Sequence, residues 1–476
     1  MSGTLLVQKA WKWLASASIP VVMATVLLAS GGVIIVISTN LVSGTGQVAW
    51  RWEPSAAVGS TWAHSWAEFP VSNTNAFNSF VSAWNGSSWG TPFQLTAPNG
   101  VQQGDVNVAW DSVRNRFVFC TLDGPGGNVW YGYSSDSSGT NWIFQPAAIF
   151  PSSTGFWDYP SIGVDASGRI IMGAVNLYGT GYYSAISTDG YNFSSPSLVV
   201  NPSTGHGARS RVVATNSLFE AFVPELDSNY NPSAVDRYES ADGVNWAGPY
   251  NLATFAAPLN NSPSSPYIFY APLLAATGYT NGLWAMGIQI NNGGYNNVFI
   301  CASDRGCGIV NSGPDDQFLN GISVSGDQGY WISYLTYSTL NTRQLPLITQ
   351  AIYFPHGQGG IGATTNTGID PTSWVVRPAG NRCSMACYAA GDYNTVASNP
   401  FAAATTPFVR QDSFQTDLYQ SFTEDPQATA NVPNFKPNFI PYPVGSDLRP
   451  LGVVNPATAP LTQAQPPNRT AGIALH

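Results

Sequence analysis

The sequence predicts an all-β fold, a six-bladed β-propeller, in which small antiparallel sheets repeat around a central channel. Three observations lead to this prediction: a phrase that occurs three times, the strand-like runs between its copies, and a composition rich in turn-forming residues. The phrase has the order Ser, Asp, Gly, Asn, aromatic, and its aspartates, Asp136, Asp189 and Asp242, are 53 residues apart twice over (189 − 136 and 242 − 189). A fixed period in this range is typical of repeat folds such as propellers.

Composition favours the same fold class. Gly and Pro account for 82 of the 476 residues (47 + 35), aromatic residues for 13% and charged residues for only 9%. Short aromatic and β-branched runs separated by Gly, Pro, Asn and Ser are typical of many strands joined by tight turns. The net charge of −9 argues against nucleic acid as a partner, because binding to phosphates needs an excess of positive charge.

Each period contains enough strand-like sequence for one blade. Between the first two copies of the phrase, such runs lie at residues 144–150, 158–165, 169–175 and 182–186, and four strands are the content of a propeller blade. A variant of the phrase, with Trp in place of Asp, lies at 82–89, but the roughly 35 residues between residue 45 and this phrase are too few for four strands, and residues 392–422 are also too few. We therefore expect the two chain ends to complete one shared sheet and close the ring, which removes exposed sheet edges. This count gives six blades; seven is the alternative if each end forms its own.

The first 45 residues are expected to form a separate segment that carries the rest of the chain out of the cytoplasm. Lys9 and Lys12 precede an apolar stretch, residues 19–37, that contains no charged residue, and about 20 apolar residues can span a bilayer. Basic residues on the N-terminal side favour keeping that end in the cytoplasm. We expect an uncleaved membrane anchor, with a cleaved signal peptide as the alternative. Residues 46–430 would then be an exported propeller, and residues 431–476 a Pro- and Asn-rich extended tail.

The cysteines agree with export. Cys301 and Cys307 are six residues apart, and Cys383 and Cys387 are four apart, so each pair could close a small loop by a disulfide in an oxidising compartment. Cys120 lies in an apolar run and is expected to be a buried free thiol. Zinc is not expected, since no histidine or second cysteine pair lies beside Cys383 and Cys387.

The repeated phrase resembles the Asp box, or BNR repeat, of sialidase-like β-propellers, and the resemblance extends over about residues 60–422 through period as well as motif. In that family the box closes the hairpin between the outer strands of a blade. The resemblance implies structural roles, in which Ser and Asp hydrogen-bond the turn's own backbone, Gly takes a positive φ and the aromatic residue packs into the sheet. The box residues are Ser134, Asp136, Gly139 and Trp142; Ser187, Asp189, Gly190 and Phe193; and Ser240, Asp242, Gly243 and Trp246.

The resemblance also implies one possible activity, that of a sialidase-like exo-glycosidase. Such enzymes hold the substrate carboxylate with three arginines, and they use an acid/base Asp and a Tyr nucleophile that a Glu makes reactive. The candidates for such roles are Arg209, Arg211, Glu220 and Tyr393. None of them stands in a motif specific enough to carry a role over, so a binding protein is the preferred interpretation.

A second set of candidates follows from the register of the repeat. If the first strands of the blades superpose, polar residues at their entrances form a ring around the channel mouth, because radial repetition turns a repeated position into a ring. Such a ring could bind Ca²⁺ or the hydroxyls of a glycan; alternatively, each Asp caps its own loop. The mouth candidates are Asp105, Trp157, Asp158, Tyr159, Arg209, Asp316 and Asp392, and those for a metal are Asp105, Asp158, Asp316 and Asp392.

These observations together predict an exported, membrane-anchored propeller that recognises a glycan or a protein outside the membrane. One alternative is a sialidase-like glycoside hydrolase acting at the channel mouth. The other is an accessory structural subunit of a membrane or cell-surface complex. Propellers host all three functions, so the fold alone does not choose among them.

Overall fold

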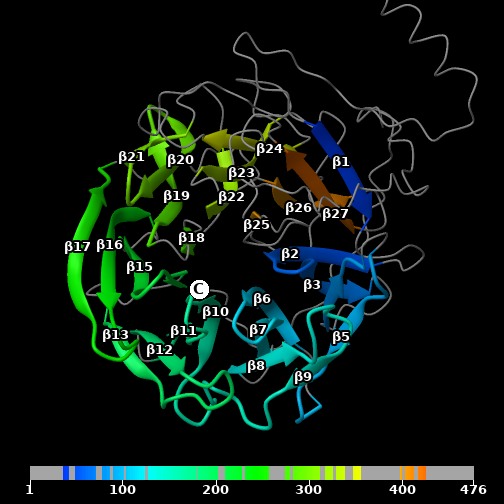
Figure 1. Ribbon diagram of the computed structural model, residues 1–476. Coiled ribbons are helices and arrows are strands. Elements are labelled where there is room, and N and C mark those ends of the chain that lie inside the picture. The colour runs from blue at the N-terminus through cyan, green and yellow to red at the C-terminus, as the bar shows by residue number, and fades with distance from the viewer. Residues whose placement is uncertain are drawn as a thin grey trace, which may run out of the picture.

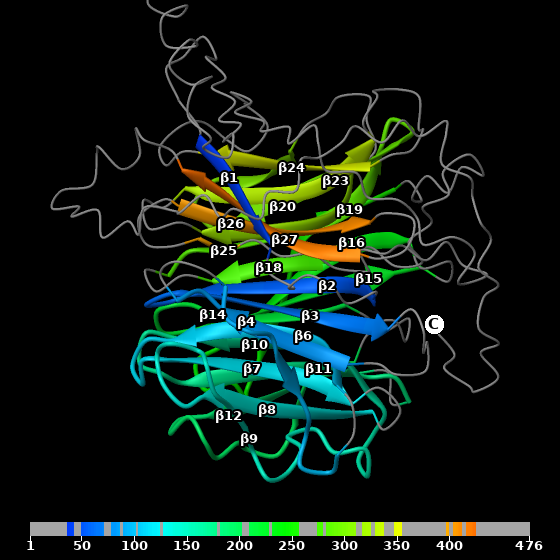
Figure 2. The ribbon, with the colours of Figure 1, turned by 90° about the vertical axis from the view of Figure 1, so that its right-hand side faces the viewer.

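The computed structural model describes residues 36–41, 49–70, 78–85, 89–100, 103–123, 127–178, 181–201, 209–227, 231–256, 274–278, 282–310, 317–324, 329–337, 347–354, 397–398, 403–411 and 416–424. These residues form strands β1 to β27 and the turns between them, and no helix occurs among them. The strands make seven antiparallel sheets arranged radially around a common centre (Figure 1). In the view turned by 90°, most strands run along the axis through that centre (Figure 2). This arrangement is that of a β-propeller.

Six sheets have four described strands and one has three. We number them 1 to 7 in chain order and give the strands of each from the innermost outward. Sheet 1 consists of β2 (Ala49–Val58), β3 (Trp62–Pro70), β4 (Asn78–Ala83) and β5 (Phe93–Leu95), and sheet 2 of β6 (Gln103–Asp111), β7 (Arg116–Asp123), β8 (Asn128–Ser134) and β9 (Trp142–Phe144). Sheet 3 consists of β10 (Trp157–Val164), β11 (Ile170–Asn176), β12 (Gly181–Ser187) and β13 (Ser197–Val200), and sheet 4 of β14 (Arg211–Ala214), β15 (Phe219–Leu226), β16 (Pro232–Ser240) and β17 (Ala247–Thr254). Sheet 5 consists of β18 (Leu274–Gly278), β19 (Trp284–Asn292), β20 (Tyr295–Ala302) and β21 (Gly306–Ile309), sheet 6 of β22 (Gln317–Val324), β23 (Tyr330–Tyr337) and β24 (Leu347–Phe354), and sheet 7 of β25 (Ala397–Ser398), β26 (Ala403–Gln411), β27 (Thr416–Glu424) and β1 (Val36–Leu41).

The position of a strand within its sheet decides its burial. The second strand of sheet 3, β11, is buried along its whole length, because both of its faces are covered by neighbouring sheets; its sequence is accordingly apolar without alternation. The outer strand β17 is largely exposed. The hydrophobic core therefore consists of layers between adjacent sheets, such as the layer in which Ile171 and Val175 of sheet 3 meet Val212 and Phe219 of sheet 4.

The innermost strands form a closed ring. Contacts run from β2 to β6, β10, β14, β18, β22 and β25, and from β25 back to β2. The seventh sheet contains both ends of the described chain, since β1 pairs with β27 in antiparallel register from Val36 opposite Glu424 to Leu41 opposite Tyr419. The preferred sequence prediction counts six blades, whereas the described strands make seven sheets.

The expected membrane anchor lies almost entirely outside the described residues, because only Val36 and Ile37 of the apolar stretch are described, and both belong to β1. Within the described part of the chain, no helix has the length and apolarity needed to cross a bilayer. The tail, residues 431–476, also lies outside the described residues.

The repeated phrases form tight turns between the third and fourth strands of sheets 2, 3 and 4. In the second, Asp189 Oδ1 accepts hydrogen bonds from the backbone N–H groups of Tyr191 (2.8 Å) and Asn192 (2.7 Å), and Ser187 Oγ accepts one from the N–H of Gly190 (2.9 Å). Gly190 has a φ of 79°, which a residue with a Cβ rarely adopts. These N–H donors stabilise the ionised form and lower the pKa of Asp189.

The third phrase repeats this geometry and the first departs from it. Asp242 Oδ1 accepts from the N–H groups of Val244 (2.9 Å) and Asn245 (2.8 Å), as Asp189 does. In the first phrase, which is longer, Asp136 Oδ1 accepts from the N–H of Ser138 at 2.8 Å, and Ser134 Oγ donates to the carbonyl of Asp136 at 2.6 Å. The aromatic residues close these turns: Trp142 Nε1 donates to the Gly139 carbonyl, Phe193 lies against Tyr131, and Trp246 Nε1 donates to Ser184 Oγ.

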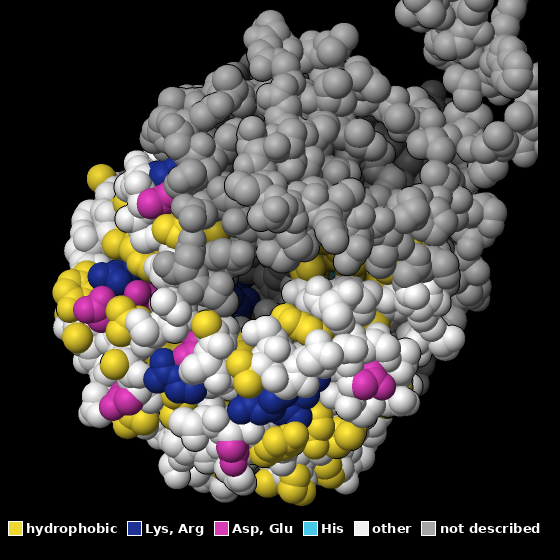
Figure 3. All heavy atoms as spheres, in the orientation of Figure 1, with side chains coloured by type: hydrophobic (Ala, Val, Ile, Leu, Met, Phe, Trp, Pro, Cys, Tyr) yellow, Lys and Arg dark blue, Asp and Glu magenta, His cyan; other side chains and the backbone are white. Residues whose placement is uncertain are grey.

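Arginines join successive sheets at this end of the strands. The guanidinium carbon of Arg116 lies 4.4 Å from the ring centroid of Tyr191 in the next sheet. Equivalent contacts across the following junctions join Arg169 to Phe219 (4.7 Å), Arg237 to Trp284 (5.3 Å) and Arg305 to Tyr330 (4.9 Å). We call this side of the ring the box face; basic side chains lie over successive sheets in the view of Figure 3.

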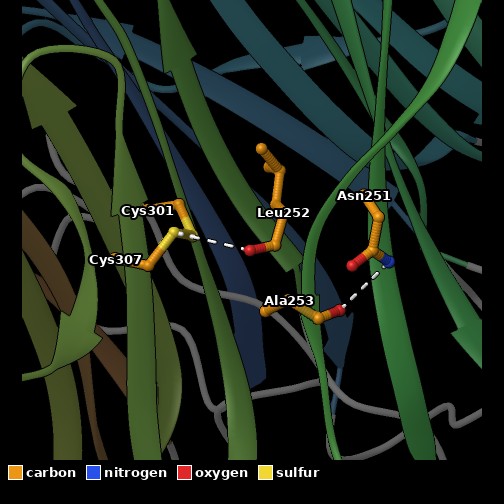
Figure 4. The surroundings of a disulfide bond; sticks show 5 residues. All are labelled: Asn251, Leu252, Ala253, Cys301 and Cys307. Atoms are coloured by element: carbon orange, nitrogen blue, oxygen red, sulfur yellow. Dashed lines mark hydrogen bonds between the residues drawn. A yellow bond between two sulfur atoms is a disulfide. The ribbon is translucent and has the colours of Figure 1, made fainter.

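The structure also tests the cysteine predictions. Cys301 and Cys307 form a disulfide between β20 and β21, as predicted. The bond faces the outer strand of sheet 4, where the Cys307 sulfur lies 3.7 Å from the Leu252 carbonyl oxygen (Figure 4). Cys120 is a buried free thiol, also as predicted. Cys383 and Cys387 lie outside the described residues.

Candidate functional site

A cavity of about 260 Å³ lies at the centre of the ring. Its described lining comes from the innermost strands of sheets 1 to 6. Most lining residues are small or apolar, and the polar ones are Ser55, Asn107, Ser161, Arg211 and Thr277. Arg211 is the single charged residue among the described residues that line it. Figure 3, which shows the box face, has a hollow at its centre with basic side-chain atoms inside it, and the lining reaches this end of the innermost strands at Trp110, Val164 and Gly278.

One backbone feature recurs at the entrances of three adjacent innermost strands, at the end of the sheets opposite the box face. Asp105, Tyr159 and Arg209 have positive φ values of 46°, 50° and 70°. In each case the residue two positions later, Asn107, Ser161 or Arg211, pairs with the second strand and lines the cavity. Residues held in such sparsely populated conformations cost energy and are enriched at ligand sites.

The carbonyl of Pro160 joins three sheets at this entrance. It accepts a hydrogen bond from Asn107 Nδ2 of sheet 2 at 2.8 Å and another from an Arg211 guanidinium nitrogen of sheet 4 at 3.1 Å. The same Arg211 nitrogen lies 3.4 Å from the carbonyl oxygen of Tyr159. Arg209 lies over the Tyr159 ring, with its guanidinium carbon 5.2 Å from the centroid. The irregular segment Tyr159-Pro160 therefore holds the Arg211 guanidinium group beside the cavity.

Serine hydroxyls tie neighbouring innermost strands together around the same cavity. Ser161 Oγ accepts from the backbone N–H of Val212 at 3.2 Å and shares a hydrogen bond of 2.9 Å with Tyr182 Oη. Ser55 Oγ accepts in the same way from the N–H of Val108 at 3.2 Å. Burial raises the pKa of Tyr182, so its hydroxyl stays protonated. These hydroxyls fix the spacing of the strands that carry Asn107 and Arg211.

The cysteine nearest this entrance carries no charge. Burial raises the pKa of the Cys120 thiol to about 12, and the nearby Arg211 charge opposes that shift only in part. The thiol is therefore protonated at neutral pH, and among the described residues of the lining Arg211 remains the charge that a ligand would meet.

The structure separates the predicted mouth residues. Asp105 and Arg209 share the position with positive φ, but the residue that matches them in sheet 3 is Tyr159, so the alignment that placed Asp158 there is wrong by one residue. Asp158 Oδ1 accepts from the backbone N–H of Tyr159 at 2.7 Å and so caps its own loop, which is the alternative role considered for these aspartates. Asp316, Asp392 and Tyr393 lie outside the described residues.

Trp157 faces the core and not the channel mouth. Its side chain is 2% exposed, and its ring packs between Phe150 (5.1 Å) and Tyr183 (5.2 Å). Its indole N–H donates to the carbonyl of Pro151 at 2.9 Å. The indole is buried among these rings, so the prediction that Trp157 contributes to a ligand site at the channel mouth does not fit its position.

The catalytic candidates are only partly brought together. Arg209 and Arg211 meet at Tyr159, whereas Glu220 of β15 makes a 2.8 Å ion pair with Arg237 and does not line the cavity. Burial raises the pKa of Glu220 to about 7, and the charge of Arg237 limits the increase. Within the described residues, no group of three or more His, Cys, Asp or Glu side chains could hold a metal ion.

Sequence reasoning missed the residues that build the entrance: Asn107, Pro160 and Ser161. A signal for one of them was present, because a proline inside a strand marks an edge or a bulge, and Pro160 directly follows Tyr159. Asn107 and Ser161 had no such signal, since Asn and Ser are frequent throughout the chain.

Comparison with known proteins gives likenesses of fold at low identity. No protein-family model matches the chain, and no curated protein matches it. Among solved structures, a PL25 ulvan lyase bound to a saccharide has a TM-score of 0.47 at 10% identity, covering 80% of this chain and 95% of its own. A protein of unknown function from Dyadobacter fermentans has 0.45 at 12%, covering 82% and 99%. The intramolecular trans-sialidase of Ruminococcus gnavus has 0.40 at 11%, covering 60% and 90%.

Proposed function

We propose that the protein is a recognition module that binds an acidic glycan at the central cavity. The observation that carries this proposal is that Arg211 is the single charged residue among the described residues of the lining, and that Tyr159-Pro160 holds it there. A guanidinium group presents parallel N–H donors that match a carboxylate. The amide of Asn107 also lines the cavity and offers a polar partner for sugar hydroxyls.

Binding is preferred over hydrolysis because of the carboxylates. Most glycoside hydrolases use a pair of carboxyl groups on either side of the scissile bond. No carboxylate is among the described residues that line the cavity, and Glu220 is paired with Arg237 elsewhere. A concave site with a few convergent polar groups supports ligand binding without such a pair.

The proposal includes the setting of the module. We propose that the seven sheets are seven blades, the last of them closed by β1 against β27. The propeller would be exported and held to a membrane by the N-terminal segment. The Cys301–Cys307 disulfide supports an oxidising compartment.

The test is calorimetric titration with acidic oligosaccharides, each paired with a neutral counterpart: tetragalacturonate with its methyl ester, and sialyllactose with lactose. We expect the protein to bind at least one acidic member and to discriminate against its neutral counterpart at least about tenfold, because one desolvated charge pair is worth about that factor. Arg211→Gln should lose this discrimination.

The matched control is Arg169→Gln, which removes an arginine from the box face and should leave binding unchanged. Thermal melting of both variants shows whether each is folded. Equal affinity for acidic and neutral members, or unchanged binding by folded Arg211→Gln, would contradict the proposal.

A further inference from the structure

Two residues of the cavity lining carry polar groups that no protein group uses. Trp110 of β6 and Thr277 of β18 both line the cavity, and both are half-buried. Among the described residues, none accepts a hydrogen bond from the Trp110 indole N–H, and none is hydrogen-bonded to the Thr277 hydroxyl. The indole N–H groups of Trp130, Trp142 and Trp157, by contrast, each donate to a protein oxygen, as is usual for tryptophan inside a protein. We call Trp110 and Thr277 the box-end pair.

The box-end pair lies near the ends of its strands at the box face. The turn that follows β6 reaches the next box turn, because Arg114 in it donates to the Thr188 carbonyl at 3.3 Å. On β18, Thr277 precedes Gly278, which ends the strand and also lines the cavity. The hollow in Figure 3 opens on this face. A ligand that enters through the hollow therefore meets the box-end pair before it reaches Arg211.

The indole ring of Trp110 is held in place by the protein. A Cβ atom at Gly59 of sheet 1 would come within 2.0 Å of the ring, so this glycine lies directly against the indole. Phe117 packs on the ring in an edge-to-face contact with a centroid distance of 4.8 Å. Trp110 is the single aromatic residue among the described residues that line the cavity. A fixed aromatic ring with an unused N–H donor suits a sugar, which presents C–H groups and hydroxyl oxygens side by side.

The two ends of the cavity differ in charge. Arg211, the charged residue of the described lining, begins β14, and Ala214 ends that strand near the box face. Three residues at about 3.3 Å each place these two positions roughly 10 Å apart. A carboxylate buried at the box-face end would have no cation beside it among the described lining residues, and burying an unpaired charge is costly. The box-face end therefore suits a neutral group.

We propose that the box-end pair binds a neutral sugar unit that is joined to the acidic unit held by Arg211. This inference rests on the proposed function and adds the composition and direction of the ligand. The Trp110 indole donates its N–H to a sugar oxygen and packs on C–H groups, and the Thr277 hydroxyl forms a second hydrogen bond. The acidic unit lies farther from the box face, and the neutral part leads out through the hollow. The ligand is then a mixed oligosaccharide and not a polymer of acidic units.

The test compares sialyllactose, in which an acidic unit is joined to neutral ones, with free sialic acid by calorimetry. We expect sialyllactose to bind at least about tenfold more tightly, because it adds two hydrogen bonds. Thr277→Val removes the hydroxyl, keeps the shape of the side chain and breaks no protein hydrogen bond. It should weaken sialyllactose binding about fivefold, the factor of one neutral hydrogen bond, and leave sialic acid binding unchanged. Thr277→Ser should keep both affinities.

Trp110→Phe removes the indole N–H and should likewise weaken only sialyllactose binding. Thermal melting accompanies it, because Trp110 also packs against Gly59 and Phe117. Trp246→Phe is the matched control, since it removes an indole N–H from a box turn outside the cavity, where the N–H donates to Ser184 Oγ. It should change neither affinity.

Several results would overturn the box-end subsite and leave the proposed function standing. One is that sialyllactose binds no better than sialic acid, or that folded Thr277→Val and Trp110→Phe bind it as the parent does, while binding still depends on Arg211. Another is that tetragalacturonate binds and sialyllactose does not, or that tetragalacturonate gains as much over galacturonate as sialyllactose gains over sialic acid. If no acidic saccharide binds, both proposals fail together.

Discussion

The two ends of the sheets follow opposite rules. At the box face, two successive turns repeat both side chains and geometry, since Asp189 and Asp242 each accept two backbone N–H groups within 0.1 Å of the same distances. At the opposite end, three successive strands repeat only the backbone geometry. There the position with positive φ is occupied by Asp105, Tyr159 and Arg209, which have nothing in common chemically.

The difference distinguishes residues that stabilise the ring from residues that could bind a ligand. A turn that repeats with its side chains solves the same problem in every sheet, namely the hydrogen bonds of its own backbone. A backbone conformation that repeats with different side chains places chemically different groups at equivalent positions of successive sheets. Strain at that place is tolerated only where the surrounding structure enforces it, and the hydrogen bonds to the Pro160 carbonyl from both neighbouring sheets do so.

The largest expected effect that tests this comparison is at the box face. Arg116 is buried, stacks between Tyr133 (4.1 Å) and Tyr191 (4.4 Å), and donates to the Gly190 carbonyl at 2.8 Å. Arg116→Met should lower the free energy of unfolding by about 3 kcal/mol, because it also takes a charge partner from the buried Asp111. Urea unfolding measures the loss, and glycan binding by the folded variant should be unchanged.

The companion variant is Arg114→Gln, since Arg114 makes the shorter ion pair with the same buried Asp111 (2.8 Å against 3.6 Å) and its loss should also lower the free energy of unfolding by about 3 kcal/mol without changing glycan binding. A folded Arg116→Met protein that no longer binds glycan would show that the two ends of the sheets are coupled. It would contradict the assignment of stability to the box face and of acidic-group binding to the opposite end.

A smaller effect is expected from the turn itself. Asp189→Ala should cost about 1–2 kcal/mol, because the N–H groups of Tyr191 and Asn192 lose their acceptor. The loss should be present at neutral pH and should disappear as the pH falls through the lowered pKa of Asp189, where the parent carboxylate is protonated as well. Chemical unfolding at several pH values measures both, and a variant that unfolds like its parent at neutral pH would contradict the structural role of the turn.

Much of the ring could be predicted from sequence because it depends on repetition. The runs at 158–165, 169–175 and 182–186 correspond to β10, β11 and β12. The run at 144–150 does not fit, because β9 ends at Phe144 and only Phe150 makes a further isolated bridge, to Val129. Apolar residues there fill the space between sheets, and pattern alone does not distinguish packing in a connection from packing in a strand.

The site was harder to predict because it depends on departures from repetition. The alignment of Asp105 with Asp158 assumed an unbroken register, whereas positive φ identifies Tyr159 as the matching residue. Shifting a register by one residue turns each side chain to the other face of the sheet. Backbone torsions leave no signal in the sequence at these positions, so the sequence did not predict the hydrogen bond of Asp158 to its own loop or the burial of Trp157.

The smallest effect on stability, and the sharpest test of the comparison, is expected at the mouth. Asn107→Ala removes one of the two hydrogen bonds to the Pro160 carbonyl, which Arg211 still contacts at 3.1 Å, so the unfolding free energy should fall by only about 1 kcal/mol. Affinity for an acidic oligosaccharide should nevertheless fall severalfold, because the segment that positions Arg211 is less constrained and a polar group of the cavity is lost. Asn192→Ala is the matched control, since it also removes one amide hydrogen bond, that to Asp189 at 2.6 Å, but at the box face. The two variants should lose similar stability while only Asn107→Ala loses affinity; similar affinities in both would mean that the strained entrance serves the ring and not a ligand.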